Sequence, residues 1–288
     1  WYPSFIIDWE RLKHHFKFGY KLTIAGVLSS IFSNIYNLVI GKYFSANEVG
    51  FYNRADTLQG FPVQNISLAL TKVTFPMFAS IQDDKVKLKS VYKKLMQQVI
   101  FWVTPLMIYL AIVAEPLFRF VLTAKWLPSV PYFQILCVTG ILYPLQMYNL
   151  NILNVLGRSD LFMKLEIIKR TIIAIGVVCA LPFGIYGLLI FQVIFSFIAF
   201  YINSFYSGRM INYSMKEQIK DIMPLFILAA VVGGIAWGLY YFLNHVLGSV
   251  DLLQIIVTGI VYVIIYLGVC NFIKISAFVD FRQLILKR

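Results

Sequence analysis

The sequence predicts an all-α integral membrane protein with about eight transmembrane helices. Three observations predict this fold class. The chain is 60% hydrophobic and only 13% charged, whereas a soluble domain is about 25% charged. It contains several charge-free apolar stretches that are long enough to cross a membrane. Its Lys and Arg residues gather in alternate connecting loops, which is typical of a multi-pass protein.

The apolar stretches define the individual helices, because a transmembrane helix needs about 20 largely apolar residues. The charge-free run 171–208 contains the turn signal Pro182-Phe183-Gly184, so it is predicted to form two helices. The stretch 46–82 is mostly apolar, although it carries charged side chains. The predicted transmembrane helices cover 18–41, 46–82, 88–114, 130–156, 160–181, 185–208, 224–247 and 250–273.

The distribution of basic residues predicts the topology. Twenty of the 25 Lys and Arg residues lie on one side of the predicted membrane, before residue 22, in 85–94, 158–170 and 209–220, and in the tail. The remaining five are Lys42, Arg119 and Lys125 on the opposite side and Arg54 and Lys72 inside 46–82. Because cytoplasmic loops carry the excess of Lys and Arg, both termini are predicted to be cytoplasmic.

The sequence lacks the residue patterns that are typical of several classes of function. The sequence holds no nucleophile elbow, phosphate-binding glycine loop or paired Cys/His spacing, so we expect no enzyme, no catalytic residue, no metal and no cofactor. The net charge of +12 is assigned to topology rather than to nucleic-acid binding, since no basic run is interleaved with aromatic residues.

The stretch 46–82 holds the main candidate site. Arg54 and Lys72 lie at predicted membrane depth, where an ionisable group is costly unless it faces a cavity or a partner. The favoured interpretation is a water-filled cavity for an anionic substrate, with Gln59, Gln64 and Asn65 between the two cations. The alternative is that both cations reach the membrane interfaces, or that Arg54 pairs with Asp56 or Glu48. Asp56 is also the closest candidate for an ion-coupling residue.

Other predicted helices carry weaker candidates. Asn34 and Asn37 are three residues apart, so they share one face of 18–41 and either line the cavity or join this helix to a neighbour. Asn151 lies near the cytoplasmic end of 130–156, where it lines the cavity or is an ordinary interfacial residue. The helices 224–247 and 250–273 hold small residues and no internal charge, so they are predicted to pack on a six-helix core.

The segment Phe44–Ala55 (FSANEVGFYNRA), followed by Thr74-Phe75-Pro76-Met77-Phe78-Ala79, carries a family resemblance. It resembles the polysaccharide-exporter branch of the multidrug/oligosaccharidyl-lipid/polysaccharide exporter superfamily, which includes lipopolysaccharide O-antigen and colanic-acid flippases. The opening Trp1-Tyr2-Pro3-Ser4 resembles the linker between the two lobes of those proteins. The resemblance implies two six-helix lobes around a central cavity, with two further helices in some members.

The resemblance assigns this chain to the C-terminal part of such a protein, without the N-terminal lobe. Because the first residue is Trp1, the chain is expected to belong to a longer protein. The implied parts are a cytoplasmic inter-lobe linker (1–17), a six-helix transmembrane lobe (18–211), an amphipathic cytoplasmic link (212–223), two additional transmembrane helices (224–273) and a cytoplasmic tail (274–288).

The function implied is that of a flippase in the bacterial cytoplasmic (inner) membrane. It would move a polyprenyl-diphosphate-linked oligosaccharide outward by alternating access, for lipopolysaccharide, capsule or exopolysaccharide biosynthesis. Expected partners are this lipid-linked substrate, membrane lipid, the missing N-terminal lobe and a polysaccharide polymerase. The alternatives are a drug/cation antiporter of the same superfamily, a membrane enzyme of glycan assembly, or a purely structural subunit.

Overall fold

The computed structural model covers all 288 residues and describes residues 9, 13, 30–247 and 250–286. The first part of the predicted helix 18–41 and nearly all of the predicted linker 1–17 lie outside the described residues. The chain divides into the units Trp1–Val49 and Gly50–Arg288, which are treated separately. The described elements are helical throughout: α2 (Ile35–Tyr43), α3 (Ala46–Ser80), α4 (Lys85–Ile112), α5 (Ala114–Leu122), η1 (Ala124–Ser129), α6 (Val130–Val155), α7 (Ser159–Ala180), η2 (Leu181–Phe183), α8 (Gly184–Met210), α9 (Met215–Leu247), α10 (Asp251–Ile273) and α11 (Ser276–Leu286).

The apolar helices agree with an all-α membrane protein. Five stretches of the described chain are long and apolar enough to cross a membrane: Lys85–Ile112, Ala124–Val155, Ser159–Met210, Met215–His245 and Asp251–Ile273. The third contains α7 and α8, which are divided at η2 and Gly184 (φ 72°), as the Pro-Phe-Gly turn signal predicts. The count of eight membrane crossings stays a prediction, because α3 is not among these five stretches.

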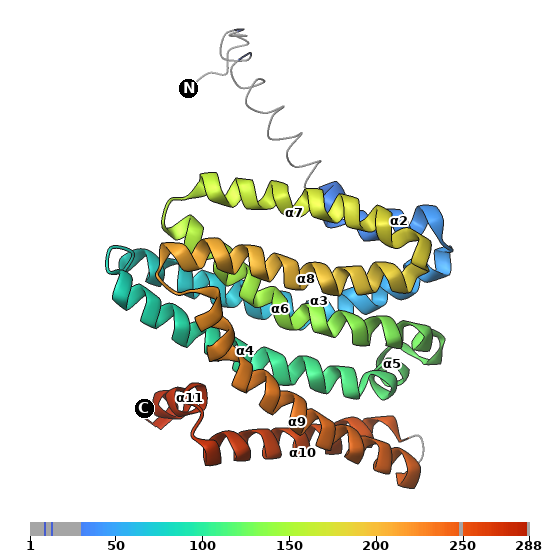
Figure 1. The fold of residues 1–288 in the computed structure, drawn as a ribbon. Helices are drawn as coiled ribbons and strands as arrows, with labels where there is room; N and C mark the ends of the chain where they lie inside the picture. Colours follow the sequence, from blue (N-terminus) through green and yellow to red (C-terminus); the bar gives the residue numbers. More distant parts are fainter. Residues whose placement is uncertain (1–8, 10–12, 14–29, 248–249, 287–288) are drawn as a thin grey trace, which may run out of the picture. The chain divides into compact units, whose positions relative to one another are not determined.

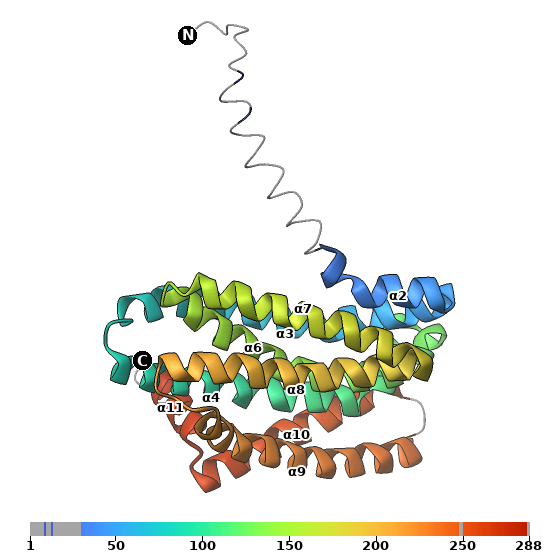
Figure 2. The same cartoon turned by 45° about the horizontal axis from the view of Figure 1, so that its top comes forward.

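The helices of the Gly50–Arg288 unit pack in the order α7, α8, α6, α4, α9 and α10 (Figures 1 and 2). A polar network joins α6 and α8 within this series. Asn149 of α6 donates from Nδ2 to Ser204 Oγ of α8 at 3.3 Å, and Ser207 Oγ donates to Asn149 Oδ1. All three side chains are buried, so the network fixes the register of α6 against α8 where apolar packing alone would leave it free.

Helices α9 and α10 are held on α4. At one end, Lys93 of α4 pairs with Asp221 of α9 at 2.8 Å. Along the helices, Tyr266 Oη donates to the Phe101 carbonyl at 3.0 Å, and Tyr109 Oη donates to the Ile255 carbonyl at 2.8 Å. The predicted link 212–223 is largely part of α9, which begins at Met215 and continues through Pro224.

Tyr213, in the turn between α8 and α9, is buried and hydrogen-bonded to α9. Its ring is 1% exposed, and its hydroxyl donates to Asp221 Oδ2 at 2.7 Å. Burial, and then the hydrogen bond to the Asp221 carboxylate, raises the pKa of Tyr213, so the hydroxyl stays protonated and remains a donor.

Replacing Asp221 by Ala is expected to lower the free energy of unfolding by about 1–3 kcal/mol, because the Tyr213 hydroxyl would be left buried without an acceptor. The matched control is Glu217→Ala. Glu217 pairs with Lys89 at 2.8 Å, but its side chain is 51% exposed, so the expected loss is about 0–1 kcal/mol. Melting of the purified protein, followed by intrinsic fluorescence, measures both variants, and equal losses would contradict the role given to Tyr213.

Candidate substrate pathway

Ser45 and Glu48 form a capping box at the start of α3. Glu48 N donates to Ser45 Oγ at 3.3 Å, and Ser45 N donates to Glu48 Oε2 at 2.9 Å. This reciprocal pair satisfies two amide groups that the first turn of a helix leaves without partners. The Glu48 carboxylate therefore accepts a hydrogen bond at the start of α3.

One face of α3 is buried against the Gly50–Arg288 unit. Apart from Gly60, its buried residues recur every three, four or seven positions, which is the spacing of a single helix face. They are Tyr52, Ala55, Gln59, Gly60, Val63, Ser67, Thr74 and Phe78. Tyr52 Oη donates to Gln192 Oε1 of α8 at 3.3 Å, and the ring of Phe78 lies 5.9 Å from that of Tyr92 of α4.

The opposite face of α3 is exposed and carries both predicted cations. At 100° per residue, five exposed residues point within about 60° of one another. We call them the α3 stripe: Arg54, Phe61, Asn65, Leu68 and Lys72. Gln64 is also exposed and lies at the edge of the stripe. Arg54 and Lys72 are five helical turns apart, or about 27 Å along the axis, which is close to the hydrocarbon thickness of about 30 Å.

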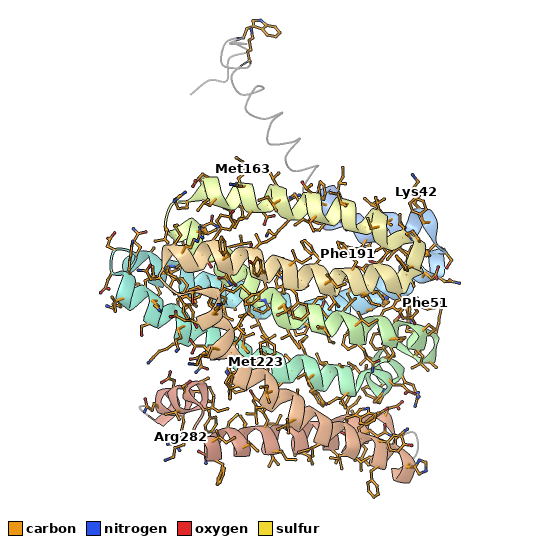
Figure 3. All side chains as sticks on the ribbon, in the orientation of Figure 1. Lys42, Phe51, Met163, Phe191, Met223 and Arg282 are labelled. Atoms are coloured by element: carbon orange, nitrogen blue, oxygen red, sulfur yellow. The ribbon has the colours of Figure 1, made fainter. Side chains whose placement is uncertain are left out.

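Arg54 lies at one end of the stripe, against Trp126 of η1. Its guanidinium carbon is 5.0 Å from the centre of the indole ring, a cation–π contact. Phe51, labelled in Figure 3, meets the same ring edge-on at 6.1 Å. Trp126 precedes the first residue of α6, so this contact lies at the predicted outer boundary of the membrane. Arg54 and Asp56 do not form an ion pair in the described structure.

Lys72 lies at the other end of the stripe, next to a contact between α3 and α6. Asn151 Nδ2 donates to Thr71 Oγ1 at 3.0 Å, and Asn151 is 7% exposed. Asn151 is four residues before the end of α6, so Lys72 lies near the predicted inner boundary. Lys72 is exposed and forms no ion pair within the part of the chain that the structure describes.

The predicted cavity residues therefore separate into groups. Arg54, Gln64, Asn65 and Lys72 share the exposed side of α3, where Asn65 Nδ2 donates to the Phe61 carbonyl at 2.7 Å. Gln59 lies on the buried side, 6% exposed, with its amide packed in the notch left by Gly140 of α6. Asn151 is buried in the same interface, and Asp56 is partly buried.

Asn34, which directly precedes α2, and Asn37, within α2, belong to the Trp1–Val49 unit. Asn34 Nδ2 donates to the Ser30 carbonyl at 2.9 Å, so the side-chain amide of Asn34 has a partner four residues earlier in the chain. Asn37 Oδ1 is buried and has no hydrogen-bond partner among the described residues. The proposal that both line a cavity stays a prediction.

Two aromatic residues of this region were absent from the predicted site. Phe61 is 72% exposed at the middle of the α3 stripe, seven residues after Arg54, and this helical spacing could have identified it. Trp126 could not be assigned from the sequence, because its contact with Arg54 joins residues 72 positions apart.

Comparisons with known proteins show which proteins this chain is similar to. The model of a family described as "Polysaccharide biosynthesis protein" matches residues 1–131. The teichuronic acid biosynthesis protein TuaB of Bacillus subtilis (strain 168) is 26% identical over 246 residues, which is 85% of this chain and 51% of the relative. The lipopolysaccharide biosynthesis protein WzxC of Escherichia coli (strain K12) is 29% identical over 191 residues, covering 65% of this chain and 39% of the relative.

A third relative, an uncharacterized membrane protein in the cps region of Klebsiella pneumoniae, is 32% identical over 137 residues, 46% of this chain and 28% of the relative. The chain spans about half or less of the length of these curated relatives. No solved structure gives a significant match. The matches confirm the resemblance predicted from residues 44–80: the chain has the apolar helices of a multi-pass membrane protein and is similar to proteins of polysaccharide biosynthesis.

Proposed function

We propose that this chain is the second lobe of a flippase that moves a polyprenyl-diphosphate-linked oligosaccharide across the cytoplasmic membrane. The α3 stripe would face the passage between this lobe and a first, N-terminal lobe. The observation that carries the proposal is the placement of Arg54 and Lys72 on one exposed face of α3, with the amides of Gln64 and Asn65 between them.

The chemistry of the stripe suits a diphosphate joined to a sugar and a lipid. Arg and Lys attract phosphate oxygens, and the attraction strengthens where water is excluded. Amide side chains can both donate to and accept from sugar hydroxyls. The exposed Phe61 and Leu68 add apolar surface to the same face, as an amphiphilic substrate needs. A stripe whose charges are both positive is unfavourable for an exporter of cations.

The positions of the two cations support a relay rather than a single binding centre. Arg54 and Lys72 lie near opposite membrane boundaries, about 27 Å apart. In alternating access, Lys72 would meet the diphosphate in the inward-open state, and Arg54 would meet it in the outward-open state. Asp56, partly buried on the side of α3 opposite the stripe, is our candidate for ion coupling, and both chain termini are placed in the cytoplasm in this proposal.

The test uses Lys72→Gln in the native protein, expressed in a host that lacks its own exporter. We expect surface polysaccharide to fall about tenfold, which corresponds to the loss of about 1.4 kcal/mol of substrate binding. Lys72→Arg should keep most of the export, because it retains the charge. Arg54→Gln should also lower export, because the diphosphate would lose its cationic partner in the outward-open state.

The matched control is Lys164→Gln, since Lys164 is an exposed lysine on α7, outside the α3 stripe. Membrane levels of every variant are measured by immunoblot. If Lys72→Gln and Arg54→Gln both export like the unmodified protein at equal levels, the cationic pathway is wrong. If deletion of the native protein fails to trap lipid-linked oligosaccharide in the inner leaflet, the flippase function itself is wrong.

A further inference from the structure

A groove with an entirely apolar lining runs between α6, α8 and α9, away from α3. Its volume is about 720 Å³. Two of its aromatic side chains are exposed, Phe197 at 53% and Tyr201 at 54%. Met223 of α9, labelled in Figure 3, lies along it. We call this the apolar groove; it is lined by Val138, Ile141, Leu142, Phe197, Ile198, Phe200, Tyr201, Met215, Ile219, Ile222, Met223 and Phe226.

A second, polar hollow of about 430 Å³ continues from one end of the apolar groove. The two share Met215, the first residue of α9. We call this hollow the basic pocket; it is lined by Phe205, Gly208, Arg209, Asn212, Ser214, Met215 and Glu217. The pocket lies at the end of the groove where α8 ends and α9 begins, at the predicted cytoplasmic boundary.

The lining of the basic pocket holds one cation, Arg209, and one acid, Glu217. Arg209 stacks on the ring of Phe205, with its guanidinium carbon 4.2 Å from the ring centre, and has no acidic partner in the described parts of the chain. Glu217, the acid in the lining, is already paired with Lys89 at 2.8 Å. Lys216 and Lys220 are exposed and each follows a residue of the groove lining, so they border the groove on α9.

From this arrangement we propose that the apolar groove and the basic pocket together bind an anionic phospholipid of the cytoplasmic leaflet. One acyl chain lies in the groove, and the phosphate is held by Arg209 and Lys216. An acyl chain gains little by leaving lipid for an apolar groove, because both surroundings are equally apolar. Selectivity therefore comes from the headgroup, and the cations favour an anionic lipid over a zwitterionic one.

The lipid site is separate from the α3 stripe, since no residue of α3 lines the apolar groove or the basic pocket. A lipid bound there would bridge the turn between the six-helix lobe and α9. The proposal does not rest on the transport function, and its test measures lipid retention alone.

The test purifies the native protein in mild detergent with equal amounts of phosphatidylglycerol and phosphatidylcholine. Native mass spectrometry then counts the retained lipids. We expect the unmodified protein to retain phosphatidylglycerol preferentially, and Arg209→Gln to reduce that preference about fivefold. Lys164→Gln, an exposed lysine on α7, is the matched control and should leave the preference unchanged.

A second variant tests the groove independently of the charge. Ile219→Trp fills the apolar groove and should lower retention of both lipids, while Arg209→Gln changes only the preference between them. Equal retention of the two lipids by the unmodified protein would overturn the proposal. An unchanged preference in Arg209→Gln would also overturn it, because the headgroup would then be held elsewhere.

Discussion

Replacing Gly208 by Ala is expected to lower the free energy of unfolding by about 1–3 kcal/mol, although the change adds only one methyl group. A Cβ at Gly208 would overlap the backbone carbonyl oxygen of Tyr213. That carbonyl cannot move freely, because Gln218, which is fully buried, donates to it from Nε2 at 3.1 Å. The Tyr213 amide in turn donates to the Gly208 carbonyl at 2.9 Å.

The matched control for Gly208→Ala is Gly268→Ala in α10. A Cβ at Gly268 meets nothing within 4 Å, and Ala favours a helix interior by about 1 kcal/mol over Gly. We expect the apparent melting temperature to fall by several degrees in Gly208→Ala and to stay constant or rise in Gly268→Ala. Equal melting temperatures for the two variants would show that the turn between α8 and α9 is looser than its hydrogen bonds indicate.

Adjacent glycines of α9 give the second large contrast. Gly233 is buried against α4, where a Cβ would lie 2.6 Å from Ile108 Cγ2, whereas a Cβ at Gly234 meets nothing within 4 Å. Small residues let transmembrane helices approach closely. Gly233→Leu should therefore push α9 away from α4 and lower stability by about 3 kcal/mol, near the upper end of the overpacking range. Gly234→Leu should be tolerated.

Both Leu variants have the same composition, so the difference between them isolates the packing of α9 on α4. The measurement is the apparent melting temperature in detergent together with surface polysaccharide in a complemented host. We expect Gly233→Leu to lower both and Gly234→Leu to leave both close to the unmodified protein. If the two variants behave alike, α9 does not depend on close contact with α4 at this position.

The sequence predicted the long helices of the second unit closely, because length and apolarity suffice for that purpose. Helices α4, α6, α7, α8, α9 and α10 begin and end within a few residues of the predicted ranges, except that α9 begins at Met215 rather than 224. The charges of 212–223 indicated a separate link. The helix nevertheless continues through them, because Lys93 and Lys89 of α4 pair with Asp221 and Glu217.

The candidate site was only partly predictable. Arg54, Gln64, Asn65 and Lys72 do share an exposed face, but Gln59, equally polar in sequence, is packed against Gly140. The hydrophobic periodicity of the sequence does not distinguish the exposed polar residues of α3 from the buried ones. The buried face of α3 carries Gln59, Ser67 and Thr74, while the exposed stripe carries Phe61 and Leu68.

The sequence by itself determined the membrane fold class, the positions of the apolar helices and the family resemblance, since each depends on local composition or on a short motif. Only the tertiary structure decided which side of α3 is exposed and which glycine of α9 contacts α4. It also decided that Arg54 forms a cation–π contact with Trp126. The physical reason is that apolar side chains in a membrane protein can face either lipid or protein. Burial is therefore set by contacts between residues far apart in the chain, and these contacts distinguish the two faces of α3.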